Sequence, residues 1–360
     1  MEPVTSIGAV GNSFRAPAPD ATGRIHGIDA WRGLVLAILG VVLHASFVLE
    51  PGLWRGVIYG TIHGFRMEAF FTISGFLACR GDDRPGWIER RAVALMIPFA
   101  FTAFMIVAAR NIFTHPLSWW SDTSYLWFLP VLMLCSLLPR WTPSLRLVII
   151  AAPVLSLLFI IQSAASSAIP PHVPDWVTSI VATPYYGLFY LAGRSIMTGR
   201  ITLTSIHAYV GLIMLLAWVT ALFAMPDFYP APTIPMRIAS NMARSLVGLS
   251  VTLAILHHAA RVQRLRWPMP QLSRAAYTIY LTHYPIISCI NLILYKTMLN
   301  RHGWSIFVAL SVMTTVSCLS IHYLLVARHP LLAFLLNGRP IRREAVARPP
   351  DPHPPEWKYS

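Results

Sequence analysis

The chain has 360 residues, of which 56% are hydrophobic and only 12% are charged, and its formal net charge is +14. Soluble domains carry about 25% charged residues, so this composition, with a mean hydropathy of +0.58, excludes an ordinary soluble protein and indicates an integral membrane protein. A positive charge can indicate nucleic-acid binding. Here, however, the basic residues stand in short clusters between apolar runs, which is the pattern of membrane topology signals. We therefore expect the lipid bilayer as a partner, and no nucleic acid.

The apolar segments of spanning length predict an all-α fold, a polytopic membrane bundle of about ten transmembrane helices. With both termini in the cytoplasm, most of the 28 arginines and lysines fall in cytoplasmic segments, as the positive-inside rule requires. The predicted spans are residues 32–49, 56–79, 92–109, 124–138, 146–163, 177–197, 207–225, 238–257, 275–295 and 304–326.

The two ends of the chain differ in composition from the apolar middle. Residues 1–24 are rich in Ala, Pro, Gly and Ser, and 336–360 are rich in Pro and Arg. We predict a disordered cytoplasmic tail over 1–24, one membrane domain over 25–335, and a second disordered cytoplasmic tail over 336–360. The four cysteines form no CxxC pair, so we expect neither a zinc site nor a disulfide framework.

Two charges interrupt the second apolar segment, Arg66 and Glu68. A charge at membrane depth costs about 2.5–3.5 kcal/mol on insertion scales, so such residues usually face a bundle interior or a water-filled cavity. They mark either a functional site or a structural ion pair. Residues two apart on a helix do not face each other, so each charge needs a partner on another helix.

Several histidines lie in or beside the apolar segments. His44 is a candidate general base, although a helix–helix hydrogen bond would also explain it. His63 stands three residues before Arg66 in the second apolar segment, so the two share a helix face. Tyr280 and His283 have the same spacing and also share a face.

The segment ends that we assign to the cytoplasm carry further charges. Asp29 and Arg32 precede the first apolar segment, and Arg90 with Arg91 precede the third. An arginine pair at a helix start suits bidentate phosphate recognition, but topology anchoring explains it equally well. Trp127 could stack on a sugar ring or belong to an interfacial aromatic belt.

Five motifs in this order, over residues 24–335, resemble acyltransferase family 3, a family of membrane O-acyltransferases. They are DAWRG at 29–33 followed by His44, FFTISGF at 70–76, the arginine pair at 90–91 with a following Pro98, LWFL at 126–129, and YLTH at 280–283. Within the family, FRM at 65–67 and FLLNG at 334–338 resemble the glucan biosynthesis protein C branch, which is associated with succinylation of osmoregulated periplasmic glucans.

The resemblance implies a multi-pass enzyme of the bacterial inner membrane. It implies acyl-CoA as a cytoplasmic co-substrate, no tightly bound cofactor or metal, and a carbohydrate hydroxyl as acceptor on the outer side. The family's first-span arginine and histidine correspond to Arg32 and His44. Our hypothesis gives catalytic roles to His44, Glu68, Arg66 and Asp29, with Glu68 or Asp29 orienting the imidazole of His44. It assigns CoA binding to Arg32, Arg90 and Arg91, and substrate binding to His63, Tyr280, His283 and Trp127.

Two departures from the family pattern affect the implied site. Eleven residues separate Arg32 from His44, where the resemblance implies ten. One extra residue turns His44 by about 100° away from the Arg32 face, unless a π-helical turn absorbs it. The arginine implied three positions after the third-segment pair is Ala94 here.

The alternative from another class is a transporter or flippase for a lipid or small solute, with Arg66, Glu68 and His283 lining its pathway. A membrane scaffold without chemistry would leave the intramembrane charges unexplained. Stabilisation of the purified protein by CoA separates an acyltransferase from a transporter. The sequence leaves open the acyl group, the acceptor, the oligomeric state, and whether His44 acts as base or as acyl carrier.

Overall fold

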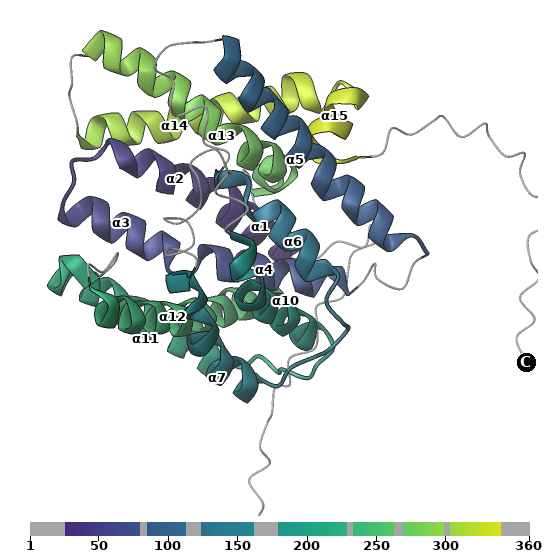
Figure 1. The fold of residues 1–360 in the computed structure, drawn as a ribbon, viewed down its shortest axis with the longest axis vertical. Coiled ribbons are helices and arrows are strands. Elements are labelled where there is room, and N and C mark those ends of the chain that lie inside the picture. The colour runs from purple at the N-terminus through teal and green to yellow at the C-terminus, as the bar shows by residue number, and fades with distance from the viewer. Residues whose placement is uncertain are drawn as a thin grey trace, which may run out of the picture.

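The computed structural model describes residues 26–79, 85–112, 124–161, 179–228, 233–262, 269–298 and 303–339. Every regular element in these residues is helical, which confirms the predicted all-α class (Figure 1). The predicted tail over 1–24 lies outside the described residues. The predicted boundary at 335 falls inside a helix, because the last helix continues to Asn337.

The first half of the chain begins with one nearly continuous rod, which is built from four consecutive helical elements. The elements are α1 His26–Gly33, η1 Leu34–Ile38, α2 Leu39–Ala45, η2 Ser46–Val48, α3 Leu53–His63, α4 Arg66–Ala78, α5 Trp87–Ile112, η4 Ser124–Leu126, α6 Phe128–Ser136 and α7 Leu145–Ser156.

The second half contains the longest helices. Its elements are η5 Ile180–Ala182, α10 Thr183–Met197, α11 Ser205–Ala224, η6 Pro226–Phe228, α12 Ile234–Arg261, α13 Met269–Met298, α14 Trp304–Ser320, η7 Ile321–Val326 and α15 Pro330–Asn337.

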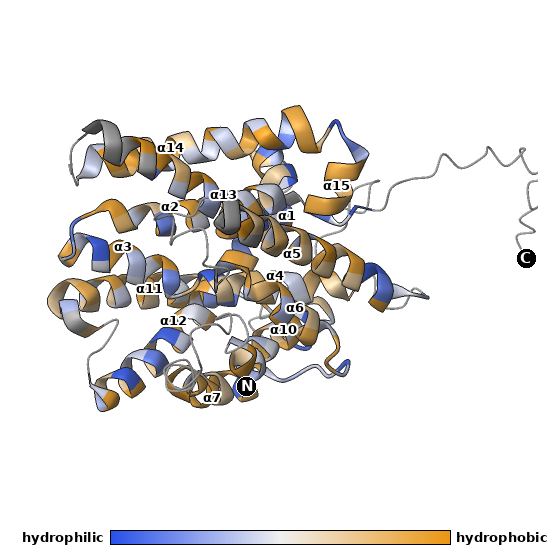
Figure 2. Ribbon diagram, turned by 45° about the horizontal axis from the view of Figure 1, so that its top comes forward, coloured by the Kyte–Doolittle hydropathy of each residue, from blue (hydrophilic) through white to orange (hydrophobic). Residues whose placement is uncertain are grey.

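Four helices among the described residues are long and apolar enough to cross a membrane. They are Gly27–Val48, Ser205–Ala224, Ile234–Arg261 and Trp304–Val326. Apolar colouring covers much of the ribbon (Figure 2). The predicted number of ten spans and the cytoplasmic position of both termini stay predictions.

The predicted span 56–79 is not one helix, and this part of the prediction is wrong. Helix α3 ends at His63, and α4 begins at Arg66 after a break at Gly64 and Phe65, whose φ is −142°. A glycine inside an apolar run weakens a helix by about 1 kcal/mol relative to alanine, and here it also admits close neighbours. A Cβ added to Gly64 would lie 2.9 Å from Nε1 of Trp218. The break gives His63 and Arg66 different directions.

Helix α4 is the buried centre of the bundle (Figure 1). Its closest neighbour is α10, and the contact depends on two glycines. A Cβ on Gly75 would lie 1.8 Å from the carbonyl oxygen of Tyr190, and one on Gly193 would lie 1.9 Å from that of Thr72. Small residues of this kind let helix backbones approach closely within membranes. The charged N-terminus of α4 is thereby fixed deep inside the protein.

The first rod contains a π-helical turn at Leu34–Ile38, between Arg32 and His44. A π turn holds one more residue than an α turn, and such turns occur frequently at functional sites. This is the feature that would absorb the eleven-residue spacing. It keeps a single face of the rod aligned from α1 to α2.

Candidate active site

A pocket of about 370 Å³ lies at the end of the bundle where α1, α5 and α13 begin. Four arginines from different parts of the chain line it, and Asp29 forms an ion pair with one of them, Arg32, at 3.2 Å. The excess of positive charge suits an anionic ligand. The residues that line it include Asp29, Arg32, Leu36, Arg91, Arg274, Asn337 and Arg339.

The arginine pair at the start of α5 is divided by the structure. Arg91 lines the pocket, and its guanidinium lies 5.6 Å from the ring centre of Tyr190. Arg90 is exposed, donates a hydrogen bond of 2.6 Å to the carbonyl oxygen of Pro85, and is not among the lining residues. Of the two arginines, only Arg91 is among the lining residues of this pocket.

A second polar region lies further along the rod, around Gly40. A Cβ at Gly40 would lie 2.9 Å from Nη1 of Arg66 and 3.8 Å from Nε2 of His283. The ring centroids of His44 and His283 are 5.1 Å apart. The structure thus brings together three of the predicted site residues: His44, Arg66 and His283. We call them, with Gly40, the Gly40 cluster.

Several polar atoms of this cluster are buried and, in the part of the chain that the structure describes, have no hydrogen-bond partner. Nη1 and Nε of Arg66, Nδ1 of His44 and Nε2 of His283 have no hydrogen-bond partner among the described residues. Arg66 is only 7% exposed. Unsatisfied buried polar groups are costly, and their presence in a native structure indicates a functional role or a bound molecule.

The orientation of His283 is set by its own helix. Its Nδ1 lies 3.2 Å from the carbonyl oxygen of Ile279 and also bonds the carbonyl oxygen of Tyr280. A carbonyl only accepts, so Nδ1 carries the proton, and in the neutral ring Nε2 is the acceptor that faces Gly40.

Tyr280 and Tyr125 hold this part of α13 against η4. The hydroxyl of Tyr280 donates to the carbonyl oxygen of Tyr125, and the hydroxyl of Tyr125 donates to that of Leu281 at 3.0 Å. Tyr280 is 3% exposed. It therefore supports the Gly40 cluster, whereas the sequence assigned it to direct substrate binding.

One face of the first rod connects the pocket to the Gly40 cluster. Asp29, Arg32 and Leu36 line the pocket, and Gly40 and His44 belong to the cluster. These positions are three or four residues apart, the spacing of a helical face. The π turn falls within the series and keeps His44 in line with Arg32.

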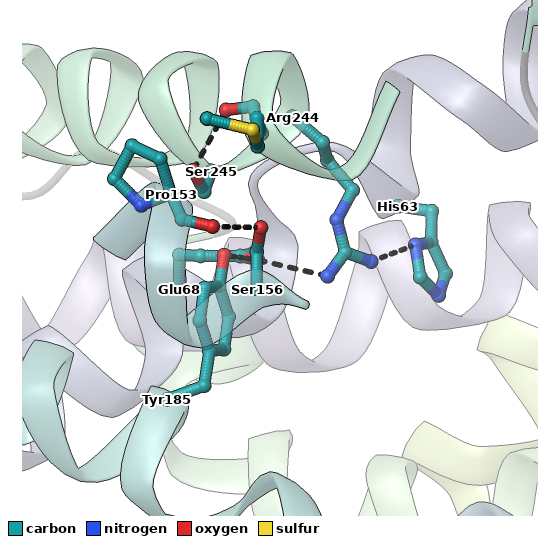
Figure 3. A network of polar contacts seen from close by, with 8 residues as sticks. His63, Glu68, Pro153, Ser156, Tyr185, Arg244 and Ser245 are labelled. Carbon is teal, nitrogen blue, oxygen red and sulfur yellow. Dashed lines mark hydrogen bonds and ion pairs between the residues drawn. The ribbon is translucent and has the colours of Figure 1, made fainter. Parts of the chain in front are cut away.

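Glu68 lies in a different buried cluster (Figure 3). Its Oε1 accepts a 2.8 Å hydrogen bond from Tyr185 and lies 3.9 Å from Nη2 of Arg244. Nη1 of Arg244 is 3.1 Å from Nδ1 of His63. The structure pairs Glu68 with these residues and shows no contact between Glu68 and His44. Asp29 likewise pairs with Arg32, so neither carboxylate orients the imidazole of His44.

Trp127 lies among aromatic side chains within the core. Its ring centre is 5.0 Å from that of Tyr186 and 6.3 Å from that of Phe71. The indole is half-buried against these rings and is not an exposed platform.

Sequence reasoning missed four residues of these clusters. Arg274 and Arg339 resembled topology anchors, and Asn337 was assigned to a tail, yet all three line the pocket. Arg244 is an arginine inside a predicted span and is 2% exposed. That position was the available signal for a buried partner of Glu68.

The described residues thus form an apolar helical bundle with a basic pocket and a buried histidine–arginine cluster. Residues 25–323 match the model of a family described as an acyltransferase domain, and the chain belongs to this acyltransferase family. This membership confirms the family resemblance that the five motifs indicated.

Curated relatives include glucans biosynthesis protein C of Shigella dysenteriae serotype 1 (strain Sd197) and of Escherichia coli O157:H7 (strain EC4115 / EHEC). Each is 29% identical over 146 residues, which cover 32% of this chain and 37% of the relative. The match thus spans little more than a third of the relatives' length. No solved structure matches the chain.

Proposed function

We propose that this membrane O-acyltransferase takes an acetyl or succinyl group from acyl-CoA at the basic pocket and transfers it to a hydroxyl of a glycan or glucan on the outer side. The observation that carries the proposal is the single face of the first rod, which joins the pocket to the Gly40 cluster. The clusters of basic residues between the apolar segments support a cytoplasmic position for the pocket, in a protein of the bacterial inner membrane.

The pocket suits the nucleotide end of acyl-CoA. Arg32, Arg91, Arg274 and Arg339 offer charge-assisted hydrogen bonds to its phosphates. His44 stands twelve positions after Arg32 in the helical rod, which corresponds to a rise of about 18 Å. An extended arm is needed to carry a thioester over this distance, and the pantetheine of CoA is such an arm. CoA acts here as a co-substrate, with no tightly bound cofactor.

The Gly40 cluster suits the transfer step. His44 takes the proton of the acceptor hydroxyl, whose oxygen attacks the thioester carbonyl. Arg66 stabilises the resulting oxyanion. Collapse of the intermediate breaks the carbon–sulfur bond, and the departing thiolate takes the proton from His44. If His44 instead carries the acyl group, the same atoms are exchanged in two steps.

Arg66 also bears on the choice of acyl group. Its Nε and Nη1 have no protein partner among the described residues, so the guanidinium can bind a second carboxylate. A dicarboxylic acyl group such as succinyl has this carboxylate, and acetyl does not. The relatives named for glucan biosynthesis support a glucan as the acceptor.

Mass spectrometry of cell-envelope glycans tests the proposal. A strain lacking the protein is complemented with wild type, with His44→Ala, or with His329→Ala, in which an exposed histidine outside both clusters is replaced. At equal membrane abundance, wild type and His329→Ala restore an acyl mass and His44→Ala does not. The added mass identifies the group. Identical glycans in all strains, together with no transfer from acetyl-CoA or succinyl-CoA by purified protein, would refute the proposal.

A further inference from the structure

The direction of Arg66 depends on the break between α3 and α4. Arg66 is the first residue of α4, directly after Gly64 and Phe65. A small rotation of α4 about this break would move the guanidinium away from Gly40. Something must therefore fix the two helix ends relative to each other.

Arg244 contacts both sides of the break (Figure 3). Its Nη1 is 3.1 Å from Nδ1 of His63, the last residue of α3, and its Nη2 is 3.9 Å from Oε1 of Glu68, in the first turn of α4. A guanidinium only donates, so Nδ1 of His63 accepts and the proton of the neutral ring is on Nε2. Phe159, at 4.2 Å from the guanidinium carbon, covers one face of Arg244.

The helix that carries Arg244 also packs directly on the break. A Cβ on Gly248 of α12 would lie 2.8 Å from Cγ of Glu68 and 3.1 Å from the carbonyl oxygen of Gly64. Tyr185 holds the other side of Glu68 through its 2.8 Å hydrogen bond. Glu68 is thus contacted from both α10 and α12, so a rotation of α4 at its start would break these contacts.

We propose that Arg244 is a positioning residue, which bridges His63 and Glu68 across the helix break and so holds Arg66 against Gly40. Its consequence for catalysis rests on the proposed function, whereas its effect on the position of Arg66 does not. The competing explanation is an ion pair that only stabilises the fold. The two explanations predict different activities when both members of the Glu68–Arg244 pair are replaced by uncharged residues, so that no buried charge is left unpaired.

The double variant Glu68→Gln/Arg244→Met makes this separation. It removes both charges and keeps similar side-chain volumes, and buried pairs replaced in this way often retain stability. Gly40→Ala is the second perturbation, because its methyl group would meet Arg66 at 2.9 Å. Arg244 is not among the described atoms within 4 Å of that Cβ position. Arg66 is the nearer of the two side chains at that position, so we expect coupling between Gly40 and the Glu68–Arg244 pair to pass through Arg66 and α4.

We expect the double variant to elute as folded protein in detergent, to keep the donor KM, and to lose about 100-fold in kcat, the effect of a misplaced catalytic group. Gly40→Ala lowers both kcat and the thermal unfolding midpoint in the wild-type background. When Gly40→Ala is added to the double variant, it has little further effect on kcat or on the unfolding midpoint, because Arg66 is no longer held against Gly40.

A wild-type kcat in the folded double variant, or a full and independent cost of Gly40→Ala in both backgrounds, would overturn the inference. If wild type transfers no acyl group, the proposed function fails instead. The unfolding midpoints of wild type, Gly40→Ala, the double variant and the double variant with Gly40→Ala then still decide whether Arg244 holds Arg66.

Discussion

Arg66 and Glu68 lie two residues apart at the start of α4, and their side chains belong to two different buried clusters. Arg66 approaches Gly40 and His283, whereas Glu68 is bonded to Tyr185 and lies beside Arg244. The first helical turn of α4 thus supplies a cation to one cluster and an anion to the other. This arrangement leaves Arg66 free to meet a substrate, because the nearest carboxylate in the sequence is occupied elsewhere.

The neighbouring arginines of α5 give a matched test of the donor pocket. Arg91→Ala removes a pocket cation, and a lost hydrogen bond to a charged group is worth about 1.5–3 kcal/mol. We expect the KM for acyl-CoA to rise about 10-fold to 100-fold. Arg90→Ala, at an exposed position beside Pro85, should change the KM by no more than about twofold. Equal effects of the two variants in a steady-state transfer assay would place the donor elsewhere.

The π turn in the first rod predicts an unusual tolerance to deletion. Deleting Ala37 reduces the number of residues between Arg32 and His44 from eleven to ten. A regular α-helix then keeps Arg32 and His44 on one face without a π turn. We expect the deletion variant to fold and to transfer acyl groups at close to the wild-type rate. Removing Ile73 from the regular helix α4 instead turns every later residue by about 100°. Size-exclusion profiles and transfer rates check both; loss of folding in the first variant would contradict the prediction.

Two glycine substitutions should have opposite effects on stability, one at the contact between α4 and α10 and one at an open position of α3. Gly193→Ala places a methyl group 1.9 Å from a backbone carbonyl oxygen. We expect it to destabilise the protein by about 3 kcal/mol or more, since backbones cannot yield as side chains do. Gly56→Ala, in a helix with nothing within 4 Å of the new Cβ, should stabilise by about 0.4–1 kcal/mol. Thermal unfolding in detergent measures both, and a neutral Gly193→Ala would show that the helices are further apart.

The end of α15 closes one side of the pocket, and Gly338 is the position at which this can be tested. Its φ is +59°, and a Cβ there would lie 2.3 Å from Cα of Ala94 in α5. Gly338→Ala should displace Asn337 and Arg339 and raise the KM for acyl-CoA.

Gly199→Ala is the control for backbone strain. Its φ is +76°, with nothing within 4 Å. This variant carries only the left-handed strain of about 1–2 kcal/mol and should leave the donor KM unchanged. If Gly338→Ala and Gly199→Ala have the same KM for acyl-CoA, the end of α15 does not take part in donor binding.

Some of the site followed from local sequence rules. The spacing of Arg66 and Glu68 showed that they do not pair, because directions on a helix repeat every 3.6 residues. The one-residue excess between Arg32 and His44 required either a rotated histidine or a π turn, and the π turn is present. The motif order identified the acyltransferase family, which the match over residues 25–323 confirms.

Composition and local spacing thus determined the helical class, the apolar segments and the family, since these depend on properties of neighbouring residues. Only the tertiary structure decided which helix faces which. It broke the segment 56–79 at Gly64, assigned Glu68 to Arg244, placed Arg91 but not Arg90 in the pocket, and added Arg274 and Arg339. These pairings depend on contacts between residues far apart in the chain, and a helical repeat contains no information about its neighbours in space.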